Sequence, residues 1–275
     1  MLLPRILTAL VGIPLVLAAI HFGGVFYMAF VVAIILLCLY EYGLILLTAK
    51  KPVNRLSLII FGIFMIIGVV ASSTDTYFKL PSNISSFFVS ICLAGVFFVE
   101  VITPKRSLER AANTLLGIIF IPWALAHLIN IRMIEPNDIG KYFTYILFFT
   151  IWATDTGAYF AGRFFGKHSL NKEVSPKKTW EGSIGGTVIA VSITLLCWNL
   201  FFPDYITYKQ ALFIGFLISI LAQISDLSQS ILKRSAGVKD SSNILPGHGG
   251  FFDRFDAFLL TAPVLYYVLV YMTVK

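Results

Sequence analysis

The sequence predicts an all-α membrane protein, a polytopic bundle of about nine transmembrane helices with its N-terminus in the cytoplasm. Hydrophobic residues make up 58% of the 275-residue chain and charged residues only 13%, with a mean hydropathy of +0.86. A soluble domain carries roughly a quarter charged residues, so lipid must be the solvent of most of this surface. The prediction also rests on the spacing of the apolar runs and on the side where basic residues fall.

Nine apolar runs approach or reach the length of a transmembrane helix, which takes about 20 residues. They cover residues 4–21, 25–48, 56–71, 84–102, 112–131, 142–161, 183–202, 210–231 and 257–274. Turn formers separate many of them, at 51–52, 81–83, 103–104, 135–138 and 202–204. The first run lacks a small-x-small cleavage site, so we expect it to stay as the first helix and not to be removed as a signal peptide.

Basic residues gather on one side of this predicted topology. With the N-terminus in the cytoplasm, 16 of the 21 Lys and Arg residues fall in cytoplasmic segments; the other five are Lys79, Arg132, Lys141, Lys209 and Lys275. This bias is typical of the positive-inside rule. It accounts for the net charge of +7 without a nucleic-acid partner, and we expect anionic lipid headgroups or anionic substrates at the membrane surface instead.

Two cytoplasmic loops, 162–182 and 233–256, are richer in ionisable groups than membrane orientation requires. We therefore divide the chain into N-terminal transmembrane helices, 1–140, and a C-terminal transmembrane region, 141–275, which carries both loops and the candidate catalytic residues. The acids Glu41 and Glu100 fall at cytoplasmic ends of spans, where we expect them to be solvated.

The helix before the second loop has a polar face. Residues spaced by three, four and three positions lie above one another on a helix. Here that spacing is found in Gln223, Asp226, Ser230 and Lys233. A carboxylate at the membrane edge is costly and usually serves a function, so Asp226 is the first candidate site residue.

Asp253 and Asp256 are three positions apart at the predicted start of the last span, which makes them neighbours on one helical face. We expect them to converge with Asp226 and to bind Mg²⁺, which typically takes one or two carboxylates plus substrate phosphates. The alternative is that both acids only complement the positive end of the last helix. Asp155, deep in an apolar run, either lines the same cavity or hydrogen-bonds within the bundle.

Basic and glycine-rich segments of both loops are candidate contacts for phosphate groups. Backbone N–H groups of the glycine turn at 246–250 can face an anion, and Glu181 offsets the N-terminal dipole of the next helix. The candidate binding residues are Lys177, Lys178, Thr179, Glu181, Lys233, Arg234, Gly249 and Gly250. A P-loop at 162–167 is rejected because its spacing is one residue short and His168 stands where Ser or Thr is required.

Many polar residues follow one another from the end of the helix before the second loop through that loop. They are Ser230 to Arg234, Lys239-Asp240, Pro246 to Gly250 and Asp253 to Asp256. This pattern resembles the family motif of CDP-diacylglycerol synthases, also called phosphatidate cytidylyltransferases. Asp155 to Tyr159 and Ser175 to Gly182 are similar to two further stretches of that family. The resemblance covers mainly residues 150–260, since the N-terminal half matches only in being hydrophobic with a similar opening.

The resemblance implies an enzyme of phospholipid biosynthesis. With Mg²⁺, it would convert CTP and phosphatidic acid into CDP-diacylglycerol and pyrophosphate. The resemblance also implies metal binding by Asp226, Asp253 and Asp256. The implied catalytic residues are Asp226, Lys233, Lys239, Asp240, His248, Asp253, Arg254 and Asp256, with the roles of Asp240 and His248 unassigned. We expect an integral protein of a bacterial cytoplasmic (inner) membrane, with its active site facing the cytoplasm. A second cation beside Mg²⁺ and the oligomeric state, a homodimer included, stay open.

The sequence departs from the family motif at two positions, where Ser225 and Gln229 stand in place of a glycine and an acid. Gln229 removes one charge from the expected rim of the site, so a metal or base role is in doubt there. The alternatives are a cytidylyltransferase for another lipid phosphate, such as an isoprenoid one, and a membrane transporter. Related halves or matching broken helices, which transporters often show, are not apparent.

Overall fold

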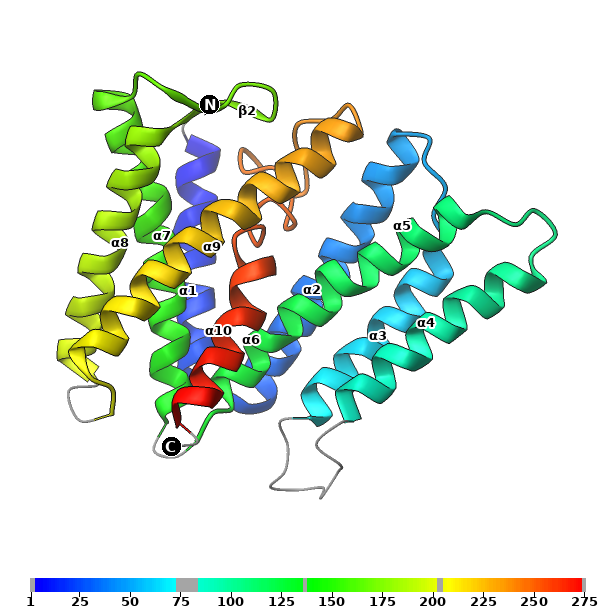
Figure 1. The fold of residues 1–275 in the computed structure, drawn as a ribbon, viewed down its shortest axis with the longest axis horizontal. Coiled ribbons are helices and arrows are strands. Elements are labelled where there is room, and N and C mark those ends of the chain that lie inside the picture. Colours follow the sequence, from blue (N-terminus) through cyan, green and yellow to red (C-terminus); the bar gives the residue numbers. More distant parts are fainter. Residues whose placement is uncertain (1–2, 73–83, 136–137, 202–204, 274–275) are drawn as a thin grey trace. The chain divides into compact units, whose positions relative to one another are not determined.

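The computed structural model describes residues 3–72, 84–135, 138–201 and 205–273, which are almost entirely helical (Figure 1). The chain forms two compact units. The first comprises residues 1–133 and 235–255, and the second comprises 134–234 and 256–275. The boundary at 133 lies close to the predicted division at 140, but most of the second loop belongs to the first unit.

The first unit is built from consecutive helices: α1 (Leu3–Phe22), α2 (Gly24–Thr48), α3 (Arg55–Ala71), α4 (Ile84–Ile102), α5 (Leu108–Ile118), the π-helical segment η1 (Ile119–Trp123) and α6 (Ala124–Arg132). Gly23 separates α1 from α2 with a φ of 63°, which a glycine adopts without steric cost. Pro122 lies within η1, and a proline removes a helical N–H donor. The apolar run predicted at 112–131 is therefore helical throughout but changes its winding in the middle.

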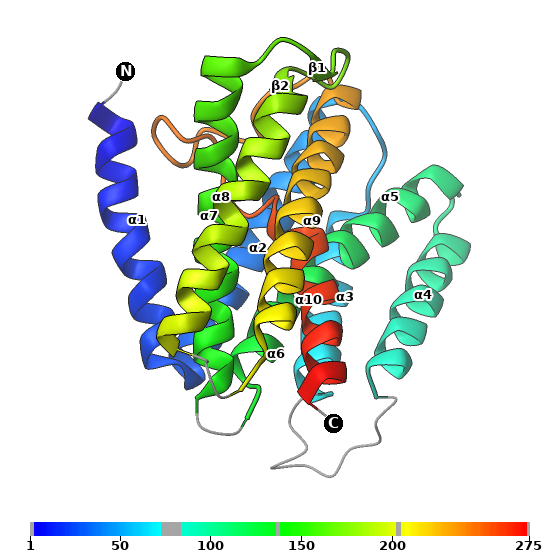
Figure 2. The same ribbon diagram turned by 60° about the vertical axis from the view of Figure 1, so that its left-hand side comes forward.

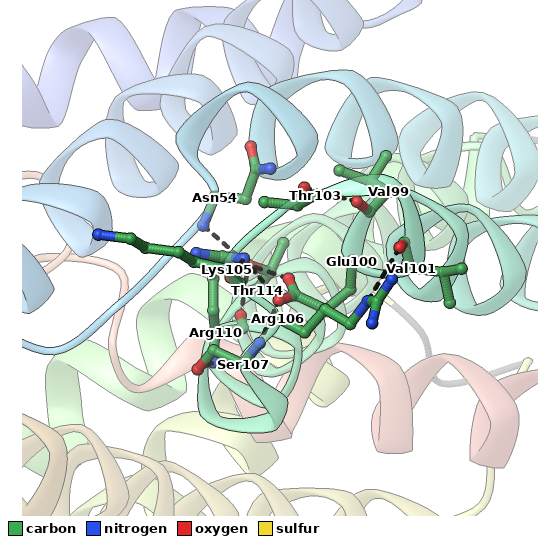
Figure 3. A network of polar contacts seen from close by, with 10 residues as sticks. All are labelled: Asn54, Val99, Glu100, Val101, Thr103, Lys105, Arg106, Ser107, Arg110 and Thr114. Carbon is green, nitrogen blue, oxygen red and sulfur yellow. Dashed lines mark hydrogen bonds and ion pairs between the residues drawn. The ribbon is translucent and has the colours of Figure 1, made fainter.

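A polar network closes the turn between α4 and α5 in the first unit (Figure 3). Arg110 forms an ion pair with Glu100 at 2.5 Å and donates to the carbonyl of Lys105 at 2.6 Å. The backbone N–H of Ser107 donates to the same Glu100 carboxylate. Glu100 is only 8% exposed, so the prediction that it is solvated is wrong. Its charge is buried because Arg110 and a backbone N–H compensate it.

The second unit contains α7 (Ile139–Phe165), β1 (Ser169–Asn171), β2 (Ser175–Thr179), α8 (Trp180–Phe201), α9 (Tyr208–Ser235) and α10 (Phe258–Thr273). Helices α7 and α8 run side by side in Figures 1 and 2. Glycines allow this close approach. A Cβ atom on Gly186 of α8 would lie 2.7 Å from the carbonyl oxygen of Thr154 of α7, and small residues let helix backbones approach in this way.

The predicted helices agree with the structure in most respects. Each of the nine apolar runs coincides with helical segments among the described residues. Five helical stretches of that part of the chain are long and apolar enough to cross a membrane: Gly24–Thr48, Ile84–Ile102, Leu108–Arg132, Trp180–Phe201 and Tyr208–Ser235. The protein is thus an integral membrane protein. The predicted turns at 81–83 and 202–204 lie outside the described residues.

The all-α prediction misses one element, an antiparallel hairpin of β1 and β2 within the loop predicted at 162–182. Ser169 pairs with Thr179, and Asn171 pairs with Ser175. Asn171 accepts hydrogen bonds from the backbone N–H groups of Glu173 and Val174, both at 3.0 Å. An asparagine side chain that binds nearby backbone in this way stabilises a tight turn.

Candidate active site

Helix α9 carries the predicted polar face. Gln223, Asp226, Ser230 and Lys233 all lie within this one helix, and all four are part-buried. Gln223 holds the face against α8, because its amide nitrogen donates to the hydroxyl of Thr187 at 3.2 Å. The structure therefore confirms that these residues share a helix.

Lys178 of strand β2 forms an ion pair with Asp226. The Nζ atom of Lys178 lies 2.5 Å from Oδ2 of Asp226, and both side chains are about one-third exposed. Successive side chains of a strand point to opposite faces, and Lys177 is exposed to solvent. The two neighbouring lysines, predicted to bind phosphate together, therefore point in different directions, and Lys178 is the one that reaches a predicted site residue.

Asp256 lies in a turn just before α10, and the charges of nearby carboxylates affect its ionisation. Burial raises the pKa of Asp256 well above its usual range, and the negative charges of Asp226 and Asp155 raise it further, whereas Lys233 lowers it. A cation beside these carboxylates would favour the charged form of Asp256. The oxygen donors of this set fit Mg²⁺, which binds proteins through oxygen.

Asp155 is exposed on α7, and its charge acts on Asp256. Of the two alternatives for Asp155, a place beside the candidate site is therefore the one supported. Within the described ranges, no three His, Cys, Asp or Glu side chains are arranged to hold a metal ion by themselves. Mg²⁺ typically needs only one or two carboxylates when substrate phosphates complete its coordination.

Asp253 belongs to the first unit and has a different environment. Its Oδ2 atom accepts hydrogen bonds from the N–H of Ser241 at 2.8 Å and from the N–H of Gly250 at 3.0 Å, and the hydroxyl oxygen of Ser241 lies 2.8 Å away. The carboxylate is only 8% exposed. Asp253 thus ties the two ends of residues 241–250 together, and we call residues 241–253 the signature loop.

The prediction that Asp253 and Asp256 share a helical face is wrong, because α10 begins only at Phe258 and both acids lie in turns. Hydrogen bonds to groups distant in sequence hold residues 250–253 in turn conformation instead. Asp253 takes the N–H of Gly250, and Glu41 takes those of Phe251 and Phe252.

The glycine turn of the signature loop is strongly curved. Gly247 and Gly249 have φ values of 76° and 79°, and the N–H of Leu245 donates to the carbonyl of Gly249 at 2.9 Å. The N–H of Gly250, predicted to face phosphates, instead donates to Asp253. The remaining predicted residues of this region differ in exposure: Lys239, Asp240 and Arg254 are exposed, whereas His248 and Gly249 are part-buried.

Glu41 is the site-related residue that sequence reasoning missed. It was expected to be solvated at the end of a span, but it is fully buried. Its carboxylate accepts hydrogen bonds from the hydroxyls of Ser241 and Ser242 and from the N–H groups of Phe251 and Phe252. The only available signal was an acid inside an apolar run, which is costly unless its charge is compensated.

The segment before α8 is shaped by Thr179 and Glu181. The hydroxyl of Thr179 accepts the N–H of Gly182 at 3.1 Å and so caps the helix. Glu181 accepts the N–H groups of Lys167 and His168 at 3.1 and 3.3 Å and lies 2.6 Å from the His168 ring. Both residues, predicted to bind substrate, therefore have a local role in fixing this loop.

Comparisons with known proteins identify the family of this chain. A model of the cytidylyltransferase family matches residues 3–272. The chain belongs to the cytidylyltransferase family. It is 33% identical over 239 residues to a phosphatidate cytidylyltransferase of Bacillus subtilis, covering 84% of this chain and 87% of the relative. The corresponding protein of Synechocystis is 32% identical over 97% of this chain and 96% of its own length.

A Rickettsia prowazekii protein of the same name is 39% identical over 72% of this chain and 93% of its own length. This cytidylyltransferase is therefore an enzyme, and its candidate site lies among residues that the family model covers. Gln229, expected at the rim of the site, is fully buried in α9. A neutral amide costs less to bury than a carboxylate, which suits glutamine at this position.

In this cytidylyltransferase, we expect Glu181→Ala to open the loop between α7 and β1. The substitution removes the acceptor of two backbone N–H groups. Trypsin should then cleave after Lys167 about tenfold faster. The matched control is Glu173→Ala, which removes the same charge from the exposed hairpin. Equal cleavage rates for both variants would contradict the assigned role.

Proposed function

We propose that this enzyme transfers the cytidylyl group of CTP to phosphatidic acid and produces CDP-diacylglycerol and pyrophosphate. The observation that carries the proposal is the cluster formed by Asp226, Asp256, Lys178 and Lys233 in an integral membrane protein of the cytidylyltransferase family. Carboxylates for a metal and lysines for phosphates are the groups this transfer requires. The names of the three relatives support the same substrate pair.

The proposed reaction is a single displacement at phosphorus. An oxygen of the phosphatidate phosphate attacks the α-phosphorus of CTP, a new P–O bond forms, and the bond to the β-phosphate breaks to release pyrophosphate. The nucleophile is already an anion, so no covalent enzyme intermediate is needed. Positioning of the reactants and neutralisation of their charge supply most of the rate.

Asp226 and Asp256 are the proposed holders of Mg²⁺, since their mutual repulsion is relieved by a cation. Bound Mg²⁺ would neutralise phosphate charge and orient the triphosphate. Asp155 contributes its negative charge to the same cluster. Metal binding by Asp253 stays a prediction; the hydrogen bonds to its Oδ2 support a role in shaping the signature loop.

Cations and loop residues complete the proposed assignment. Lys178 and Lys233 act on the carboxylate cluster and would meet the phosphates that arrive there. Arg234, Lys239 and Arg254 are exposed and would attract the anionic substrates. Substrate contacts of Lys177, Asp240, His248 and Gly249 stay predictions.

The membrane topology forms part of the proposal. Nine spans with the N-terminus in the cytoplasm would place both polar loops on the cytoplasmic side, where CTP is available. The distribution of Lys and Arg supports this orientation. The bacterial relatives support a bacterial cytoplasmic membrane, with the lipid substrate entering sideways from the bilayer.

The proposal is tested with purified protein in detergent, labelled CTP and phosphatidic acid. We expect labelled CDP-diacylglycerol and an equal amount of pyrophosphate with Mg²⁺, and neither product after EDTA. Replacing phosphatidic acid with an isoprenoid phosphate examines the alternative lipid and should give no product. A CDP-lipid formed only from the isoprenoid phosphate, or full turnover in EDTA, would contradict the assignment.

A further inference from the structure

The buried Glu41 carboxylate of α2 is bound almost entirely to the signature loop. Ser241 and Ser242 donate from their hydroxyls at 2.8 and 2.7 Å, and Phe251 and Phe252 donate from their N–H groups at 3.0 and 2.7 Å. The donors are about 200 positions away in sequence and come from both ends of the loop. One side chain on a helix therefore gathers two distant parts of the loop.

Glu41 is also connected to Asp253 through a shared hydroxyl. The Oγ atom of Ser241 lies 2.8 Å from Oε2 of Glu41 and 2.8 Å from Oδ2 of Asp253. A Cβ atom on Gly250 would clash with both Glu41 oxygens. Only glycine fits between the carboxylate and the loop, so the contact leaves the loop backbone little room to move.

The residue next to Glu41 strengthens this attachment. Tyr42 packs edge-on against Phe252 with ring centroids 6.5 Å apart, and its hydroxyl donates to the carbonyl of Asn113 at 2.8 Å. Both Tyr42 and Phe252 are fully buried. The signature loop is thus bound by α2 through polar contacts of Glu41 and an apolar contact of Tyr42.

We infer that Glu41 is a positioning residue for cytidylyl transfer, which orders the signature loop so that His248 and Asp253 take their working positions. The inference rests on the proposed function, because that function assigns the loop to the reaction. A buried carboxylate with no hydrogen bonds would be very costly. Four donors of one loop are therefore a strong constraint on the loop's conformation.

The chemistry of the donors makes glutamine a poor replacement. Each Glu41 oxygen accepts one backbone N–H and one hydroxyl. A hydroxyl can rotate and accept instead, but a backbone N–H cannot. The amide nitrogen of glutamine would face one N–H donor-to-donor, and that end of the loop must move away. Small displacements of reacting groups reduce rates strongly, by about 100-fold for 1 Å.

The chain offers a matched control in Glu100. This carboxylate is also buried in the first unit, and it also accepts a backbone N–H, from Ser107 (Figure 3). Its partners are Ser107, in the turn between α4 and α5, and Arg110 of α5, and neither belongs to the signature loop. Glu41→Gln and Glu100→Gln therefore make the same chemical change at two buried sites, only one of which contacts the signature loop.

The experiment compares both variants with the wild-type protein by two measurements. Hydrogen exchange followed by mass spectrometry should show about tenfold faster exchange of peptides from 241–253 in Glu41→Gln only, and of peptides from 103–114 in Glu100→Gln only. The kcat per folded enzyme should fall about 10- to 100-fold in Glu41→Gln, and it should stay within about twofold in Glu100→Gln. Wild-type turnover with CTP and phosphatidic acid reports separately on the proposed function.

A third variant keeps the inference testable if Glu41→Gln does not fold. Ser242→Ala removes one of the four donors and should lower kcat about threefold to tenfold, with faster exchange confined to the signature loop. The inference is overturned if Glu41→Gln, or Ser242→Ala in its place, leaves kcat and loop exchange as in the wild type. It is also overturned if Glu100→Gln lowers kcat as much as Glu41→Gln.

Discussion

Asp226→Asn is expected to lower the rate of CDP-lipid formation by about 100-fold, a loss typical of removing one group that stabilises transferred charge. The substitution removes a negative charge from the cluster with Asp256 and leaves the Lys178 ammonium, 2.5 Å away, without its ion-pair partner. A cation would bind less tightly to the carboxylate that remains. The measurement is the initial rate at saturating CTP and phosphatidic acid over a range of Mg²⁺ concentrations.

Asp138→Asn is the matched control for this prediction. Asp138 belongs to the same unit and forms an ion pair with Lys141 at 3.0 Å, but its side chain is 59% exposed. An exposed pair of this kind contributes less than about 1 kcal/mol, so activity should stay close to that of the wild type. Asp226→Asn with a rate near the wild-type value would remove Asp226 from the proposed metal site.

Gly186→Leu is expected to cause the largest loss of stability. A Cβ atom at this position of α8 would lie 2.7 Å from the carbonyl oxygen of Thr154 and 3.0 Å from the Cβ of Ala158, both on α7. These are backbone or short side-chain atoms that cannot turn away, so the helices must separate. Overpacking of this kind costs about 3 kcal/mol, which lowers the midpoint of thermal unfolding in detergent by roughly 5–10 °C.

Gly12→Leu provides the comparison, since a Cβ atom on Gly12 of α1 would meet no heavy atom within 4 Å. Its thermal midpoint should stay within about 2 °C of the wild-type value, as for most substitutions away from packed sites. Equal thermal midpoints for the two leucine variants would show that α7 and α8 do not depend on the close approach at Gly186.

Much of the helical structure could be predicted from local sequence. The nine apolar runs coincide with helical segments, as expected because a chain in lipid must satisfy its backbone hydrogen bonds internally. The polar face of α9 was predictable for a similar reason, since the helical repeat alone brings Gln223, Asp226, Ser230 and Lys233 together. Both inferences depend only on residues close in sequence.

Residues that depend on distant partners could not be predicted in this way. Asp253 and Asp256 are three positions apart, yet α10 begins only at Phe258, and the preceding residues 250–252 donate their N–H groups to Asp253 and to the distant Glu41. The donor and acceptor are separated by about 200 positions in the case of Glu41. No periodicity or propensity near residue 41 reports such a partner.

The sequence by itself determined the membrane setting, the course of the helices and the residue types that phosphate chemistry requires. Those properties follow from composition and from the spacing of residues close in sequence, both of which can be read without the tertiary structure. The tertiary structure alone decided that Lys178 and not Lys177 reaches Asp226, that Asp155 acts on Asp256, and that Glu41 holds the signature loop. Each of these depends on which groups, distant in sequence, come into contact. Only the tertiary structure decides whether hydrogen bonds and ion pairs offset the cost of burying a charge.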